Sequence, residues 1–171
     1  WRLWDYWERH LDPDLFIDRS LKGAVKGKVV MITGGSSGIG EAAAIRIAEA
    51  GGKVLVVARD EEKLAEVRKK ITDAGGFVKT YSCDITEYAA NDKLAKDVLK
   101  EFGHVDVLIN NAGRSIRRSL ALSYDRFHDF ERTMQLNYFA CVRLTMNLLP
   151  SMTARKNGHV INVSSIGVLT N

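Results

Sequence analysis

Residues 33–40, Thr-Gly-Gly-Ser-Ser-Gly-Ile-Gly, carry the strongest fold signal in this chain of 171 residues. They directly follow the apolar run Val29-Val30-Met31-Ile32, which predicts a short strand buried on both faces. A helical pattern of apolar residues follows, from about residue 39 to residue 50. A glycine-rich turn between a buried strand and a helix is typical of a strand–helix–strand unit and predicts a parallel sheet.

Strand and helix patterns alternate along the rest of the chain. Further strands are predicted over 53–58, 77–83, 105–109 and 159–163, and further helices over 60–74, 86–102 and 124–153. Strict alternation predicts an α/β fold, a doubly wound parallel sheet of the Rossmann type with helices on both faces. This domain is expected to span 28–171 and to be truncated at its C-terminus. Residues 1–27 are expected to form an N-terminal helical extension and a connector.

The N-terminal extension is rich in tryptophan. Trp1, Trp4, Trp7 and Leu11 fall on one helical stripe, and Asp12-Pro13 then breaks the pattern. Such a stripe must cover an apolar surface. We expect it to dock on its own domain or on a neighbouring one. A membrane-surface helix is the alternative, which the acidic polar face disfavours.

Composition narrows the class of protein. The net charge is +4 and the positive charges are scattered, which does not indicate a nucleic-acid partner but suits a ligand with phosphate groups. The two cysteines, Cys83 and Cys141, have no metal-binding spacing and are expected to be small buried side chains in a cytoplasmic protein without a metal. We see no signal peptide and no run of about 18 apolar residues that would predict a membrane span.

The glycine turn predicts where a phosphate ligand binds. Gly34 permits the tight turn, and Gly38 lets the backbone approach a pyrophosphate whose charge the N–H groups of the helix N-terminus stabilise. Gly40 allows the helix to pack closely on the sheet. The turn and its context therefore predict a dinucleotide site.

Five motifs in a fixed order give a family resemblance. These are the T-G-x-x-x-G-I-G turn, Asp84 after the third strand, Asn110-Asn111-Ala112-Gly113 after the fourth, Asn137 within the long helix, and Asn162-Val163-Ser164-Ser165 after the fifth. Together they resemble the short-chain dehydrogenase/reductase family over about residues 28–171. The resemblance implies that Ser165 and Asn137 are catalytic. It implies that the cofactor is bound by Gly34, Ser36, Ser37, Gly38, Ile39, Gly40, Arg59, Asp84, Ile85, Asn111, Ala112 and Gly113.

Structural roles compete with some of these assignments. Asp84 is also placed to cap the helix expected from Thr86, and Asn110 and Asn111 are also typical turn residues. Asn137 opposes its own helix, because its side chain competes for backbone hydrogen bonds, and this favours a functional role.

The end of the second strand indicates which nicotinamide is bound. Arg59 can pair with a 2′-phosphate through its planar fork of donors, and Ser36 or Ser37 can add a hydroxyl. Asp60, one position later, reads as a helix N-cap rather than as a ligand for a ribose hydroxyl. The pattern Ala-Arg-Asp-x-x-Lys-Leu resembles family members that prefer NADP. We therefore expect NADP(H) rather than NAD(H), unless Arg59 is only a surface charge.

The resemblance also implies a Tyr-x-x-x-Lys pair beyond the catalytic serine. None of the five tyrosines here has Lys four positions later, so we expect these 171 residues alone to show no turnover. In the family the tyrosine is the general acid, with a pKa lowered by the lysine and the cofactor. Ser165 would hydrogen-bond the substrate oxygen, and Asn137 would hold a water that relays the proton.

The leading interpretation is an NADP(H)-dependent oxidoreductase that acts on a small-molecule carbonyl or alcohol. A non-catalytic NADP(H) sensor on the same fold is the alternative. Arg114, Arg117 and Arg118 suit an anionic substrate such as an acyl thioester, or else are exposed charges. The tract of residues 4–16, Trp-Asp-Tyr-Trp-Glu-Arg and Leu-Asp-Pro-Asp-Leu-Phe around His10, resembles the lead-in to the reductase domain of bacterial multidomain fatty acyl-CoA reductases.

The long helix is expected to mediate homo-oligomer contacts over about 127–152, as similar helices do in the family. Its apolar residues are too many for one buried face. They are Phe127, Phe130, Met134, Leu136, Phe139, Leu144, Leu148 and Leu149.

Overall fold

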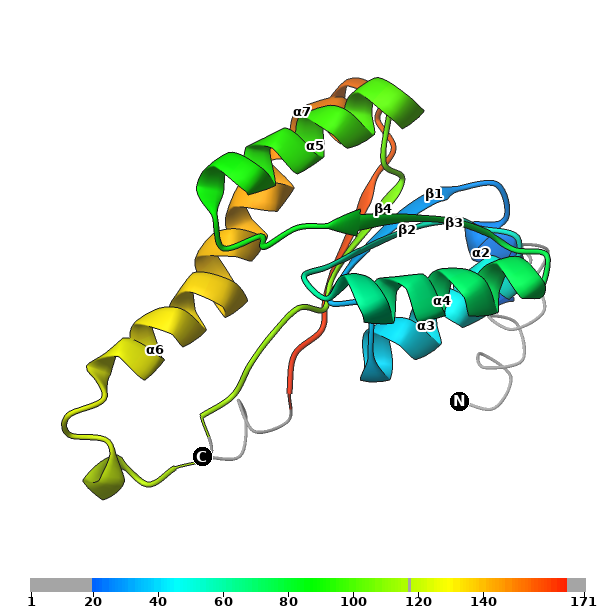
Figure 1. Cartoon of the computed structure of the whole chain (residues 1–171). Coiled ribbons are helices and arrows are strands. Elements are labelled where there is room, and N and C mark those ends of the chain that lie inside the picture. The colour runs from blue at the N-terminus through cyan, green and yellow to red at the C-terminus, as the bar shows by residue number, and fades with distance from the viewer. Residues whose placement is uncertain (1–19, 117, 166–171) are drawn as a thin grey trace, which may run out of the picture.

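A computed structural model describes residues 20–116 and 118–165, which form a five-stranded sheet with helices on both faces (Figure 1). All strands are parallel, in the order β3-β2-β1-β4-β5. Their bounds are β1 Val29–Thr33, β2 Lys53–Ala58, β3 Phe77–Ser82, β4 Val107–Asn110 and β5 His159–Asn162. The prediction of a Rossmann-type parallel sheet is confirmed.

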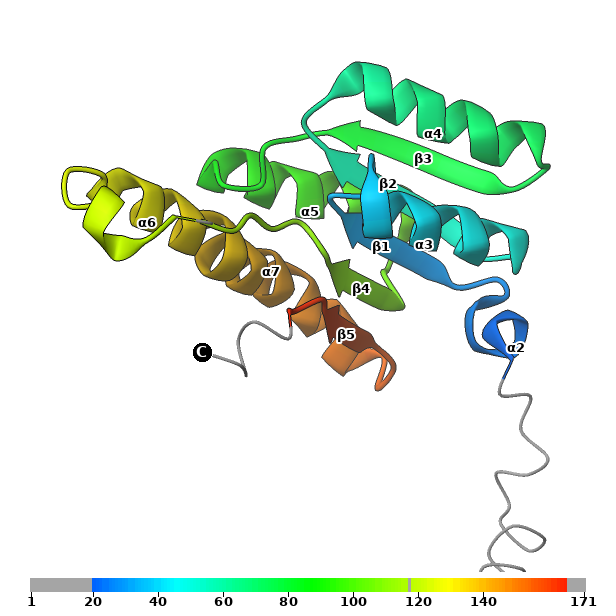
Figure 2. The same ribbon diagram turned by 90° about the horizontal axis from the view of Figure 1, so that it is seen from below.

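Helices cover the two faces of the sheet in pairs. Helices α3 (Gly38–Glu49) and α4 (Glu61–Asp73) lie on one face, and α5 (Tyr88–Phe102) and α7 (Cys141–Ala154) lie on the other (Figures 1 and 2). Successive strand residues alternate between the two cores, with Met31 facing α5 and α7 and Ile32 facing α3 and α4. Because both faces are covered, β1 is buried along its whole length.

A short helix precedes the first strand. Helix α2 (Leu21–Val25) begins after the N-cap Ser20, whose hydroxyl accepts the Gly23 N–H at 3.1 Å. Val25 is only 7% exposed and packs in the core beside α3 and α4. The segment predicted as a plain connector thus contributes a helix and a core side chain. The tryptophan stripe lies outside the described residues.

The predicted long helix is interrupted by one π-helical segment. Helix α6 (Phe127–Met134) leads into the π-helix η3 (Gln135–Ala140), and α7 follows directly. A single-turn 3₁₀ helix, η2 (Leu120–Leu122), lies before α6. The apolar periodicity alone predicts an unbroken α-helix, because a single π-helical turn changes the spacing of the apolar residues too little to be recognised. Asn137 lies within the π-helical segment, and such segments are frequent at functional sites.

The buried carboxylate of Asp106 has three partners at the amino edge of the sheet. One oxygen accepts the Val29 N–H at 2.9 Å, and the other accepts from the Arg155 guanidinium at 2.9 Å. His104 Nε2 lies 3.3 Å from the same carboxylate. Burial raises the pKa of the Asp106 carboxyl, but these partners outweigh it and hold the pKa below its ordinary value.

Within residues 20–116 and 118–165, no helix has the length and apolar character needed to cross a bilayer.

Candidate cofactor site

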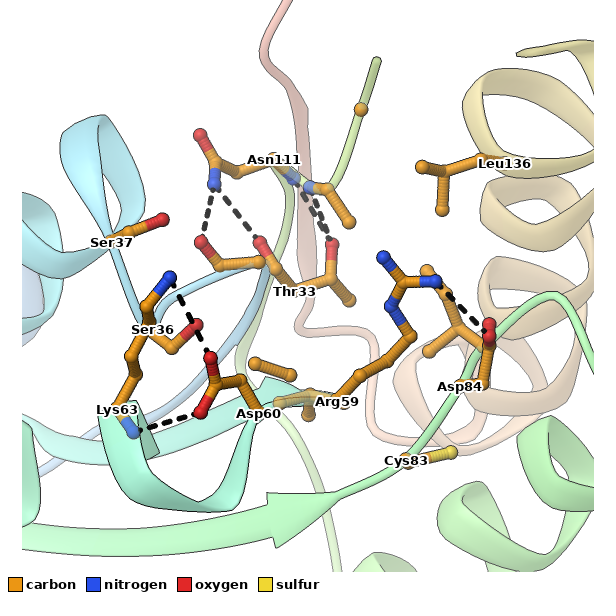
Figure 3. Close-up of a pocket in the computed structure, with 16 residues that line it drawn as sticks. Thr33, Ser36, Ser37, Arg59, Asp60, Lys63, Cys83, Asp84, Asn111 and Leu136 are labelled. Atoms are coloured by element: carbon orange, nitrogen blue, oxygen red, sulfur yellow. Dashed lines mark hydrogen bonds and ion pairs between the residues drawn. The ribbon is translucent and has the colours of Figure 1, made fainter. Parts of the chain in front are cut away.

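A pocket of about 650 Å³ opens at the carboxyl edge of the sheet, where ligands bind in open α/β folds (Figure 3). The turns after β1, β2, β3 and β4 all contribute to it, together with η3. Nine of the residues assigned to the cofactor line this pocket: Gly34, Ser36, Ser37, Arg59, Asp84, Ile85, Asn111, Ala112 and Gly113. Seven further residues line the pocket that were not predicted as ligand contacts: Thr33, Val57, Ala58, Asp60, Lys63, Cys83 and Leu136.

The glycine turn has the backbone geometry that the sequence predicts. Gly34 adopts a φ of +65°, and a Cβ there would lie 2.8 Å from the Ala112 Cα. Gly38 adopts a φ of +56°, and a Cβ there would meet no atom within 4 Å, so the space beside this backbone is open to a ligand.

Three residues that were also assigned to the cofactor, Gly38, Ile39 and Gly40, are not among the residues that line the pocket. Gly40 is buried, and a Cβ there would collide with the Gly34 carbonyl and the Asn111 side chain. Ile39 is 71% exposed.

Thr33 fastens the glycine turn to the segment after β4. Its hydroxyl accepts the N–H groups of Asn111 and Ala112, both at 3.1 Å (Figure 3). The Asn111 amide returns two bonds, to the carbonyls of Thr33 and Gly34, each at 3.1 Å. The asparagine therefore bonds to the neighbouring turn rather than acting only as a turn residue. A buried threonine at the end of a strand is the sequence signal that marks such a connection.

Asn110, the last residue of β4, connects the end of β4 to the end of β5. It is 4% exposed, and its Nδ2 donates to Asn162 at the end of β5 at 2.9 Å. Ser165 follows three residues later and is exposed, at the same edge of the sheet but outside the lining of the pocket.

Arg59 and Asp84 face one another across the mouth of the pocket. The guanidinium and carboxylate are 3.5 Å apart, and the Arg59 side chain is 75% exposed (Figure 3). An exposed pair of this length contributes little to stability, so the Arg59 side chain can exchange partners at small cost.

Asp84 does not cap the next helix. Helix α5 begins at Tyr88, later than predicted, and Asp84 instead accepts the Thr86 N–H at 3.0 Å and the Thr86 hydroxyl at 2.7 Å. Burial raises the pKa of the Asp84 carboxyl, but the bonds from Thr86 and the charge of Arg59 outweigh it, so the pKa lies below its ordinary value. Asp84 is therefore an ionised acceptor at the pocket wall.

Asp60 is the N-cap of α4, as predicted. Its carboxylate accepts the Lys63 N–H at 3.1 Å, and the Lys63 ammonium lies 3.5 Å away (Figure 3). The pKa of this carboxyl is held below its ordinary value, chiefly by the backbone bond. The Asp60 carboxylate, just after β2, is thus already engaged by Lys63 of α4. The neighbouring residue, Arg59, adds a second cation at this position.

Asn137 lies outside the pocket lining but next to it in the chain, because Leu136 forms part of the wall. Its side chain holds Arg114, the residue directly after the Asn110–Gly113 motif, by bonds to both backbone groups. A Cβ at Gly113 would lie 3.5 Å from the Asn137 oxygen.

The arginines of the cluster Arg114, Arg117 and Arg118 differ in their surroundings. Arg118 donates to Asp129 at 3.0 Å, and Arg126 donates to the same carboxylate at 2.9 Å. Arg118 is therefore paired with a carboxylate of α6, which it shares with Arg126. The side chain of Arg114 is exposed, and Arg117 lies outside the described residues.

Cys83 and Cys141 are half-buried rather than fully buried as expected, and burial raises the pKa of both thiols. In the part of the chain that the structure describes, no group of three or more His, Cys, Asp or Glu side chains is arranged to hold a metal ion.

The residues of this pocket fit a nicotinamide dinucleotide. The open space beside Gly38 at the N-terminus of α3 suits a pyrophosphate, since N–H groups there point outward. The ionised Asp84 and the cation Arg59 stand at one end, and the backbone of Asn111 to Gly113 forms the other.

Comparison with known proteins agrees with this geometry. The family model described as short chain dehydrogenase matches residues 28–170. A fatty acyl-CoA reductase of Acinetobacter baylyi is 60% identical over 147 residues, which cover 86% of this chain and 50% of that protein. A fatty acyl-CoA reductase of Mycobacterium tuberculosis is 46% identical over 162 residues, covering 94% and 55% respectively. The chain thus spans about half the length of these curated relatives.

Solved structures show the same fold with either nicotinamide. A metagenomic short-chain oxidoreductase in complex with NADP superposes with a TM-score of 0.78 at 35% identity, covering 83% of this chain and 64% of that one. A 7α-hydroxysteroid dehydrogenase complexed with NADH superposes with a TM-score of 0.80 at 30% identity, covering 86% and 56%. With its parallel sheet, its glycine turn and its match over residues 28–170, the chain belongs to the short-chain dehydrogenase family of oxidoreductases.

Proposed function

We propose that this chain binds NADP(H), in preference to NAD(H), for an oxidoreductase that interconverts a carbonyl group and an alcohol. One observation carries the preference. The carboxylate of Asp60 is engaged by Lys63, whereas the Arg59 guanidinium stands exposed at the pocket mouth in a weak ion pair. A 2′-phosphate would meet a cation there, and a ribose 2′-hydroxyl would meet no uncommitted acid from β2.

The pocket residues divide the cofactor between them. Arg59 and Ser36 or Ser37 would hold the 2′-phosphate, and Asp84 with Ile85 would hold the adenine. The turn from Gly34 to Gly40, including Gly38 and Ile39, would hold the pyrophosphate, and the segment Asn111–Gly113 would border the nicotinamide ribose. The bound cofactor supplies the hydride.

Two residues outside the pocket lining are proposed for the chemical step. Ser165, exposed beyond β5, would donate a hydrogen bond to the substrate oxygen as charge develops on it. Asn137 would hold the water that relays the proton. Replacing Ser165 by Ala should reduce kcat by a factor of about 10²–10³ in an active form of the enzyme, which is the usual value of one such donor.

The substrate class we propose is a fatty acyl derivative, such as an acyl thioester. Support comes from the two relatives named fatty acyl-CoA reductase and from the exposed Arg114 beside the pocket, which suits an anionic carrier. We further propose a cytoplasmic homo-oligomer. A pure cofactor sensor is the second candidate, although a sensor has no need of Ser165 and Asn137.

Direct titration tests the proposal. NADPH and NADH are added to the protein, and the change in the fluorescence of the reduced nicotinamide itself on binding is followed. We expect saturable binding of both, with NADPH the tighter ligand. Equal affinities, or tighter binding of NADH, would contradict the assignment of Arg59. The absence of saturable binding of either nucleotide would contradict the function itself.

A further inference from the structure

Two amide side chains tie the loop after β3 to the π-helix η3. The loop spans residues 83–87 and is called here the Asp84 loop. Gln135, the first residue of η3, donates to the Thr86 carbonyl at 3.0 Å. Asn91, on α5, donates to the Ile85 carbonyl at 2.9 Å and to the carbonyl of Ala140, the last residue of η3, at 3.1 Å. Successive carbonyls of the loop are thus bonded to one end of η3 directly and to the other through Asn91.

Asn91 occupies an unusual environment for an amide. It is fully buried on the face of α5 that carries Leu94, Ala95 and Val98, and its Oδ1 is buried without a hydrogen-bond partner among the described residues. A buried oxygen without a partner destabilises the fold, and an apolar side chain at this position would avoid that cost. The two hydrogen bonds that Asn91 donates offset this cost.

Gln135 has a second, longer contact on its other side. The Tyr88 hydroxyl lies 3.4 Å from the Gln135 Oε1, and the Arg143 guanidinium lies over the Tyr88 ring at 4.7 Å. Both polar atoms of the Gln135 amide therefore have a partner, which favours its orientation toward the Asp84 loop.

The same π-helix carries two residues of the candidate site. Leu136, next to Gln135, forms part of the pocket wall and lies across from Asp84 (Figure 3). Asn137, one residue further, clamps the backbone of Arg114. A continuous series of bonds therefore runs from the Asp84 loop through η3 to the residue that follows the Asn110–Gly113 motif.

We propose that Asn91 and Gln135 are positioning residues that hold the Asp84 loop and η3 as one unit. The site for the adenosine half of the cofactor and the placement of Asn137 then depend on each other. The adenosine assignment rests on the proposed function, whereas the mechanical unit is a property of the chain itself. The coupling between the loop and η3 can be measured directly at one backbone amide.

That amide is the N–H of Arg114, which donates to Asn137 Oδ1 at 2.9 Å on the exposed side of the pocket. Its hydrogen exchange, followed by NMR in the ligand-free protein, reports whether Asn137 is in place. Gln135→Met and Asn91→Leu each remove the tie without a large change in volume. We expect exchange at Arg114 to become about 5- to 10-fold faster, the effect of weakening one hydrogen bond.

Two controls separate positioning from general loosening. The amide of Leu55, in the interior strand β2, reports global stability and should keep its exchange rate. Asn147→Leu removes a similar amide bond, to Asp92 at 2.8 Å, at the interface of α5 and α7, but touches neither the loop nor η3. It should leave Arg114 unchanged.

The outcomes are distinct. Unchanged exchange at Arg114 in Gln135→Met would overturn the proposal, even if Asn91→Leu failed to fold. Parallel acceleration of Arg114 and Leu55, or an equal effect of Asn147→Leu, would show a merely structural role and would overturn it too.

Addition of 2′,5′-ADP, which represents only the adenosine half of the cofactor, should slow exchange at Arg114 in the unaltered protein and less so in Gln135→Met. Bound 2′,5′-ADP without this effect would refute the mutual dependence. Failure of 2′,5′-ADP and NADPH to bind would contradict the proposed function, and the ligand-free comparison would still decide the positioning role.

Discussion

The Asn137 side chain forms hydrogen bonds with both the N–H and the carbonyl of Arg114. Its Oδ1 accepts the Arg114 N–H at 2.9 Å, and its Nδ2 donates to the Arg114 carbonyl at 2.8 Å. The two residues are 23 positions apart in the chain. The side-chain amide of Asn137 therefore joins the π-helix to the loop after Gly113, and it matches a peptide group in both directions.

The first prediction concerns this pair. Asn137→Asp keeps an acceptor for the Arg114 N–H but places a carboxylate oxygen against the Arg114 carbonyl, so the loop should detach. Trypsin should then cleave after Arg114 about 5- to 10-fold faster than in the unaltered protein, since one bond is lost and one repulsion is added. The melting temperature should move little, because the contact is exposed. Unchanged cleavage would show that other contacts hold the loop.

The second prediction concerns cofactor choice. Arg59→Glu should weaken NADPH binding by about 10- to 100-fold, the value of one charge-assisted bond to a phosphate, and should leave NADH binding within about threefold. Fluorescence titration of both nucleotides measures this. Asp73→Lys, on the far end of α4, introduces a charge change without approaching the pocket and is the control. A matched loss for NADPH and NADH would show that Arg59 does not read the 2′-phosphate.

The third prediction tests the Thr33 hydroxyl. Thr33→Val keeps the shape of the side chain but leaves the N–H groups of Asn111 and Ala112 without their acceptor. The free energy of unfolding should fall by about 1–3 kcal/mol, the cost of unpaired buried groups. Thr33→Ser retains the oxygen and should recover most of that loss. Urea denaturation of the three proteins measures it, and equal stabilities for Val and Thr would contradict the role.

The fourth prediction is a pH dependence set by Asp106. Its pKa in the fold lies below the ordinary value of 3.8, so the carboxylate stabilises the fold above about pH 4 and loses that contribution as the pH falls through the folded pKa. Asp106→Asn should cost about 1–3 kcal/mol at pH 7 and progressively less below pH 4. Urea denaturation at pH 3 to 7 measures the difference. Asp97→Asn, which breaks only an exposed pair with Lys93, should change little at any pH.

The fifth prediction concerns self-association. The helices over 127–152 bury Leu144 and Leu148 in the core and expose further apolar side chains on another side. These exposed side chains can be buried only against a partner molecule. The exposed members include Phe127, Phe130, Met134, Phe139, Met146 and Leu149.

We expect this surface to pair with a second copy of the protein. Met146→Glu, at 66% exposure, should shift an oligomer toward monomer in sedimentation velocity at micromolar concentration without changing the melting temperature of the monomer. A protein that sediments as a monomer before any substitution would refute this expectation.

The sequence by itself determined the architecture. The four-residue apolar run from Val29, the glycine turn and the alternation of period-2 and period-3.6 patterns are local properties, and together they predict the parallel sheet and the edge where ligands bind. The N-cap at Asp60 was equally predictable, because a cap depends only on residues within the next turn.

Only the tertiary structure decided which distant groups meet. Nothing in the local pattern distinguishes Thr33 as the acceptor for Asn111, or places Arg59 against Asp84, because these contacts join separate strand ends. The π-helical segment η3 within the long helix was not predictable either. A π-helical turn keeps the apolar composition of the helix and shifts only the position of the residues around its axis. Local sequence fixes the elements through backbone preference and burial, whereas the partners of Asn91 and Asn137 depend on which elements the sheet brings together.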